Sequence, residues 1–151
     1  MAFQPDGGGF YVGRTTGIQL WSLGRATRRT REFGEADRDY EALAVSPDGD
    51  RLLSISTAAG TRGNLDSPRR VTLWNGKKGE VISRLEGLTA APPTAVAFVP
   101  NNEDQVLIGT REGELCVWDM KTQARMARVQ VHTRAANRLE VSQDGRYAVS
   151  G

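Results

Sequence analysis

The chain has 151 residues, with 20 basic and 18 acidic side chains and a formal net charge of +2. This near balance argues against a dedicated nucleic-acid or membrane-surface protein, because such proteins usually carry a clear excess of basic charge. The single cysteine, Cys116, excludes an internal disulfide and a multi-cysteine metal cage, and the single histidine, His132, excludes a histidine-rich metal site. No run of 18 apolar residues is present, so the sequence predicts no membrane partner, and we expect a cytoplasmic protein.

A turn of the Pro-Asp-Gly type recurs four times along the chain. The blocks that contain it begin 42, 53 and 43 residues apart, and a tryptophan follows each of the first three. Repetition at this interval indicates a series of similar supersecondary units. The blocks and tryptophans are Phe3 to Gly7, Val45 to Gly49, Phe98 to Asn102 and Val141 to Gly145, with Trp21, Trp74 and Trp118.

Each repeat reads as a set of short β-strands. The apolar runs are four to eight residues long, rich in Val, Leu, Ile, Thr and aromatic residues, and bounded by turn residues. No stretch has the period and caps of an amphipathic helix, so we expect an all-β chain. In chain order the predicted strands cover 9–13, 18–21, 26–33, 40–45, 51–56, 71–74, 80–85, 94–98, 105–110, 115–118, 124–131, 137–141 and 147–151.

Four strands in about 43 residues are typical of one blade of a β-propeller. We therefore predict a partial propeller of four-stranded antiparallel blades, two complete and two incomplete. Its segments are an incomplete blade at 1–34, a blade at 35–86, a blade at 87–131 and the start of a further blade at 132–151. The long second interval comes from an inserted, mostly polar loop at 58–70, and such insertions often lie on a binding face.

The chain resembles the WD40-repeat family, in particular bacterial WD40 repeat proteins. The third repeat carries the Trp118-Asp119 dipeptide, and His132 lies 13 residues before Gly145, the spacing of the family's repeat. The first and second repeats depart from this pattern with Trp21-Ser22 and Trp74-Asn75.

The resemblance implies a hydrogen-bond network in each blade, which links an Asp, a His, a Ser or Thr and the indole of the tryptophan. Thr110 and Trp118 match two members in the third repeat, and Glu112 is a possible stand-in for the Asp. The histidine positions of the second and third blades fall near Glu35 and Leu88, so we expect no complete network. The blades should then depend more on apolar packing.

The two ends of the chain fall inside predicted blades. A closed ring needs about 4–8 blades, and repeat units bury their apolar faces on neighbours. We therefore expect the remaining blades to come from a longer chain, with self-assembly of several copies as the alternative.

The candidate chemical groups all have simpler structural explanations. His132 could act as a general base, but no nucleophile accompanies it, and Cys116 is expected to be a buried, unreactive thiol. The carboxylates Glu35, Asp37, Asp39, Glu103 and Asp104 fall in turns, where they hydrogen-bond the backbone. We expect no catalytic residue, no cofactor and no metal. The glycines at 7–9 lack a following helix for phosphate binding, and the basic run Arg25, Arg28, Arg29 and Arg31 lacks the aromatic residues of a nucleic-acid site.

Two loops remain as candidate binding elements: the turn at 37–40 and the inserted loop, with Arg62, Asn64, Asp66, Arg69 and Arg70. Both should open on the same face, where the resemblance implies that WD40 domains bind peptides and proteins. Arg and Tyr are enriched in binding hot spots. The predicted partner-binding residues are Arg38, Tyr40, Arg62, Arg111, Arg134 and Arg138.

The predicted function is a non-catalytic scaffold that binds a protein or peptide. An alternative is an accessory or sensor propeller of a larger enzyme, such as a bacterial protein kinase. An enzymatic propeller is a further alternative, but it would need a cofactor or catalytic triad that the sequence does not show.

Overall fold

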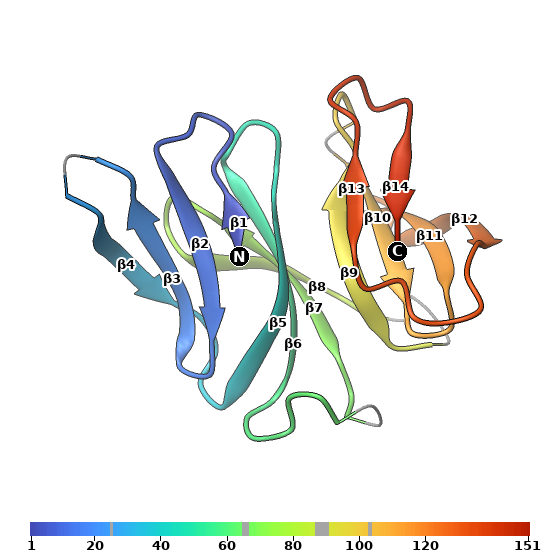
Figure 1. Ribbon diagram of the computed structural model, residues 1–151, viewed down its shortest axis with the longest axis horizontal. Helices are drawn as coiled ribbons and strands as arrows, with labels where there is room; N and C mark the ends of the chain where they lie inside the picture. The colour runs from blue at the N-terminus through green and yellow to red at the C-terminus, as the bar shows by residue number, and fades with distance from the viewer. Residues whose placement is uncertain (25, 65–66, 87–90, 103) are drawn as a thin grey trace. The chain divides into compact units, whose positions relative to one another are not determined.

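The computed structural model describes residues 1–24, 26–64, 67–86, 91–102 and 104–151, and every regular element in these ranges is a β-strand (Figure 1). Arg25, Asp66, Leu88 and Glu103, which were named above, lie outside the described residues. The strands form four antiparallel sheets of four, four, four and two strands, and the strand order in each sheet follows the chain. The predicted all-β class is confirmed, and the series of antiparallel sheets agrees with a partial β-propeller. The chain divides into two compact units, Met1–Arg84 and Leu85–Gly151.

The first unit contains two sheets. Short turns join most of their strands, and Gly7 and Gly49 take φ values of 71° and 78° in equivalent turns, as the repeated Asp-Gly pairs predict. The outer strand β4 is almost fully exposed, whereas β6 is buried on both faces. The strands are β1 (Ala2–Phe3), β2 (Gly9–Arg14), β3 (Gly17–Ser22) and β4 (Arg28–Phe33) in one sheet, and β5 (Arg38–Val45), β6 (Arg51–Ala58), β7 (Arg70–Asn75) and β8 (Glu80–Leu85) in the other.

The core of the first unit joins its two sheets. Its buried members come from both: Tyr11 and Ile18 from the first, and Tyr40, Leu52 and Trp74 from the second. The ring of Trp74 lies 6.4 Å from that of Tyr40 and 5.6 Å from that of Phe33, measured between centroids. Aromatic pairs at these distances add packing energy to the burial of their apolar surface.

The second unit contains a four-stranded sheet and a two-stranded one. Its apolar cluster consists of Ala95, Ala97, Leu107, Leu115, Ala136 and Leu139, so it too is built from both sheets. The hydroxyl of Thr94 donates to the carbonyl of Ala136 at 2.7 Å and ties the two together. The strands are β9 (Pro93–Phe98), β10 (Gln105–Thr110), β11 (Glu114–Asp119), β12 (Ala124–Gln130), β13 (Leu139–Val141) and β14 (Ala148–Ser150).

The three tryptophans occupy equivalent positions in the strand register. Trp21 pairs with Phe10, Trp74 with Leu52 and Trp118 with Val106. Side chains two residues apart on a strand share one face. The residue two positions after each pairing partner therefore lies on the same face as the indole. Its side chain determines whether a hydroxyl group is available to accept the indole N–H.

Only the second sheet supplies a hydroxyl at that position. The indole Nε1 of Trp74 donates to Ser54 Oγ at 2.9 Å. Val12 and Ile108 stand at the equivalent positions, and the buried Nε1 of Trp118 has no hydrogen-bond partner among the described residues. Thr110, the expected hydroxyl of the third repeat, instead accepts the backbone N–H of Glu114 at 3.1 Å.

Removal of the Ser54 hydroxyl should lower the free energy of unfolding by about 1–3 kcal/mol, because Ser54→Ala leaves a buried indole N–H unsatisfied. Thr72→Val is the matched control: Thr72 is 1% exposed and its Oγ1 has no partner among the described residues. This change should be neutral or slightly stabilising. Urea unfolding measures both, and Ser54→Ala should cost less in a Trp74→Phe background. Equal effects of Ser54→Ala and Thr72→Val would contradict the assigned bond.

Candidate partner-binding site

The predicted turn at 37–40 is mostly strand, because β5 begins at Arg38. The start of β5 and the inserted loop lie at the same end of the second sheet. The antiparallel pairing of β5 with β6 places the start of β5 beside the end of β6. The backbone N–H of Ala59 donates to the carbonyl of Asp37 at 2.8 Å, and the N–H of Gly60 donates to Asp39 Oδ2 at 2.9 Å. The first unit therefore brings the turn before β5 together with the inserted loop.

Buried side chains hold the inserted loop against β5. Arg69 has a 5% exposed side chain, and its Nε donates to Glu41 Oε2 at 2.8 Å. The other oxygen of Glu41 accepts the N–H of Gly63 at 3.4 Å. Asp39 is 1% exposed and caps the backbone of Gly60, the kind of role expected for it from sequence. The described part of the insertion is thus fixed to the sheet at several points.

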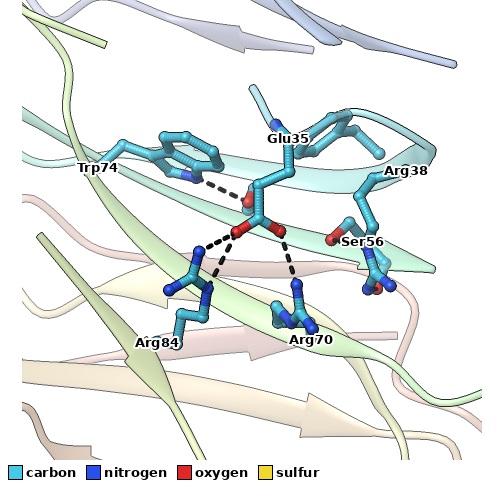
Figure 2. Close-up of polar contacts among 8 residues, drawn as sticks. Glu35, Arg38, Ser56, Arg70, Trp74 and Arg84 are labelled. Atoms are coloured by element: carbon cyan, nitrogen blue, oxygen red, sulfur yellow. Dashed lines mark hydrogen bonds and ion pairs between the residues drawn. The ribbon is translucent and has the colours of Figure 1, made fainter. Parts of the chain in front are cut away.

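A cluster of four charged residues, here called the Glu35 cluster, lies beside these loops: Glu35, Arg38, Arg70 and Arg84. Figure 2 shows the Glu35 carboxylate between two guanidinium groups. Glu35 Oε2 accepts Nη1 of Arg70 at 2.7 Å, and Oε1 accepts Nε and Nη2 of Arg84 at 2.9 and 2.5 Å. Arg38 donates to the hydroxyl and the carbonyl of Ser56 at 3.3 and 2.8 Å.

The Glu35 cluster has more positive than negative charge. Burial acts to raise the pKa of Glu35, but the hydrogen bonds from Arg84 and Arg70 outweigh it and hold this pKa below its usual value. Burial, followed by repulsion from Arg70, lowers the pKa of Arg38. The side chains of Arg70 and Arg84 are 43% and 47% exposed, while that of Glu35 is 17% exposed. The solvent-exposed part of this cluster therefore consists mainly of guanidinium groups.

Tyr40 lies in the core of the first unit. Its side chain is 2% exposed, and its hydroxyl accepts the backbone N–H of Glu35 at 2.7 Å. Burial raises the pKa of this phenol, so it stays protonated. Tyr40 thus positions the loop that carries Glu35, whereas Arg62, on the inserted loop, is exposed to solvent.

The other three predicted binding residues belong to the second unit. Arg111 is partly buried in the β10–β11 turn, and Arg134 and Arg138 are exposed between β12 and β13. This turn and the segment after β12 are joined through the backbone. The N–H of His132 donates to the carbonyl of Gly113, and that of Ala136 donates to the carbonyl of Thr110, both at 3.0 Å.

The other residues singled out from the sequence, Asp119, His132 and Cys116, take part in local hydrogen bonds or in the core. Asp119 Oδ1 accepts the backbone N–H groups of Lys121 and Thr122 at 2.9 and 2.8 Å and so caps the turn after β11. The ring of His132 is hydrogen-bonded to Ser150 Oγ through Nε2 at 2.8 Å. Cys116 is fully buried, as expected, and this burial raises the pKa of its thiol.

A cavity of about 530 Å³ lies at the opposite end of the first unit. Most of its charged groups already interact with one another or with the backbone: Lys77 pairs with Asp50 at 2.6 Å, and Asp48 accepts the N–H of Asp50 at 3.0 Å. Arg31 adds one exposed guanidinium group to its lining. It is therefore a weaker candidate for a charged ligand than the Glu35 cluster. In the ranges that the structure covers, no group of acidic, His or Cys side chains could hold a metal, and no helix could span a membrane.

From the sequence, Glu35 is expected near the histidine position of the WD40 repeat that the chain resembles, whereas Arg84 is not predicted as a site residue. A carboxylate where the family places a hydrogen-bonding histidine was the available signal for Glu35. Arg84 had none, because it lies 49 residues further along the chain and only the folded sheet brings it near.

No family model matches the chain. Ribosome biogenesis protein YTM1 of Coprinopsis cinerea is 27% identical over 116 residues, which are 76% of this chain. The chain spans about a quarter of the length of this curated relative, 23%. Nothing in the match supports a bacterial source. This similarity and the repeated four-stranded sheets together agree with a WD40-type repeat architecture.

Proposed function

We propose that the chain is a non-catalytic scaffold that binds one protein or peptide partner. The partner would bind at the loop face, which is formed by the inserted loop at 58–70, the start of β5 and the Glu35 cluster. The observation that carries this proposal is the inserted loop, which the partly buried Arg69–Glu41 pair fixes beside the partly exposed guanidinium groups of Arg70 and Arg84. A loop held in place loses little conformational entropy when a partner binds, and arginine is enriched in binding hot spots.

The proposal includes the predicted division into blades at 1–34, 35–86, 87–131 and 132–151, and a ring completed by further blades. The relative is named for ribosome biogenesis, so a protein of that process is a partner class to test first. The cytoplasmic location stays a prediction.

The test is selection from a random peptide display library on the immobilised chain. A variant with Arg62, Arg70 and Arg84 changed to alanine should lose the selected peptides. The matched control removes three exposed charges from the outer strand β4, at Arg28, Arg29 and Arg31, and should retain them. Thermal unfolding of both variants confirms that they fold. Failure to enrich any peptide, or equal loss in both variants, would count against the loop face as the binding site.

A further inference from the structure

We infer that the partner segment is acidic, and that Glu35 occupies the place a partner carboxylate takes in the complex. This inference rests on the proposed function, because it names the chemistry of the partner at the same loop face.

The side chains of the Glu35 cluster have more hydrogen-bond donors than acceptors. Each guanidinium has five N–H donors in a planar fork that fits a carboxylate. Arg70 uses Nη1 on Glu35, Arg84 uses Nε and Nη2, and Arg38 uses Nε and Nη2 on Ser56. Two guanidinium groups therefore share one carboxylate, and the third, that of Arg38, is hydrogen-bonded to Ser56 in the same cluster. A partner carboxylate that took the place of Glu35 would meet N–H donors that the fold already orients.

The arginines and the carboxylate of the Glu35 cluster come from different kinds of element. Arg70 begins strand β7, and Arg84 lies within β8. Glu35 comes from the loop before β5, directly after Gly34, whose φ is 139°. The guanidinium groups thus belong to the sheet, whereas the carboxylate belongs to a connection. A partner carboxylate can replace Glu35 without disturbing the strand ladder.

The surroundings of the Glu35 cluster suit an acidic peptide better than a nucleic acid. Binding of single-stranded nucleic acid needs exposed aromatic rings on which bases stack. Of the aromatic residues near the cluster, Tyr40 and Trp74 are each 2% exposed and belong to the core. Phe33 is partly buried, and its ring packs against the rings of Trp74 and Tyr11. The surface offers charge without a stacking platform, which favours a peptide carboxylate.

Fluorescence anisotropy can test this with a short labelled peptide of alternating Asp and Glu, and with its Asn/Gln counterpart. The acidic peptide should bind, the amide peptide should not, and binding should weaken as salt rises. Glu35→Gln should strengthen binding by about 3- to 10-fold, because it removes the internal competitor. Changing Arg70 and Arg84 together to alanine should weaken it by at least about tenfold. If the double variant unfolds, Arg84→Ala alone is used instead, and it should also weaken binding.

The matched control is Glu32→Gln. Glu32 is also an acid paired with an arginine, but it lies in β4 and bonds Arg29 at 2.5 Å. This variant has the same net charge as Glu35→Gln and should bind the acidic peptide like the unchanged chain. If both variants strengthen binding equally, the effect is one of net charge, and Glu35 is no competitor.

Two further outcomes would overturn the inference. If an oligouridine binds more tightly than the acidic peptide and needs Arg70 and Arg84, the cluster is a nucleic-acid site. If the peptides selected from the display library require the loop face but are not acidic, the scaffold function stands and the acidic partner does not.

Discussion

Replacing Gly113 by alanine is expected to lower the free energy of unfolding of the second unit by at least about 3 kcal/mol. Gly113 has a φ of 82°, a conformation that costs an L-residue about 1–2 kcal/mol. An added Cβ would lie 2.2 Å from the carbonyl oxygen of His132 and 2.5 Å from that of Arg134. These are backbone atoms, and the carbonyl of Gly113 itself accepts the N–H groups of Val131 and His132 at 3.1 and 3.0 Å. The clash can be relieved only if this connection shifts.

Gly60→Ala is the control that separates the clash from the backbone conformation. Gly60 has a similar φ of 76°, but an added Cβ would meet no atom within 4 Å. It should therefore cost only about 1–2 kcal/mol. Urea unfolding measures both variants, and hydrogen exchange at the amides of Val131 and His132 should quicken only in Gly113→Ala. If the two substitutions lower the free energy of unfolding equally, the close approach at Gly113 does not contribute to stability.

The sequence predicts the local part of this feature and not the rest. Glycine in Arg111-Glu112-Gly113-Glu114 indicates a hairpin turn with positive φ, and the structure confirms it between β10 and β11. The segment that packs on the turn follows another strand, so no short-range pattern predicts that contact. Strand positions, in contrast to this contact, can be predicted from local sequence. The run at 71–74 is found as Arg70–Asn75, because β-strand composition and turn residues are local signals.

At the candidate site, the sequence does not predict which side chains are buried. Tyr40 was predicted to bind a partner because tyrosine is common at interfaces, yet its ring is buried and its hydroxyl is satisfied by the N–H of Glu35. Asp39, its neighbour on β5, is also buried. When a strand is covered on both faces, alternation in sequence does not separate core from surface. The pairing of Glu35 with Arg84 depends on the fold in the same way.

Trp74→Ala should cost about 3–5 kcal/mol, the range for removing a large aromatic side chain from a core. The indole is 2% exposed, packs against the rings of Phe33 and Tyr40, and donates to Ser54. Because the cluster around it includes Tyr11 and Ile18 from the other sheet, the cavity would weaken the packing between the two sheets of the first unit.

Trp21 provides the comparison, because it holds the equivalent position in the first repeat. It is only partly buried, and its ring stacks on Phe10 at a centroid distance of 6.4 Å and an angle of 8°. Trp21→Ala should therefore cost clearly less than Trp74→Ala, since it removes fewer contacts and leaves no closed cavity. Circular dichroism during urea unfolding measures both without relying on tryptophan fluorescence. Trp74→Phe keeps most of the packing and should stay folded if the alanine variant does not. If both alanine variants lose the same free energy of unfolding, the contribution of each tryptophan to stability depends on its position in the repeat and not on its packing.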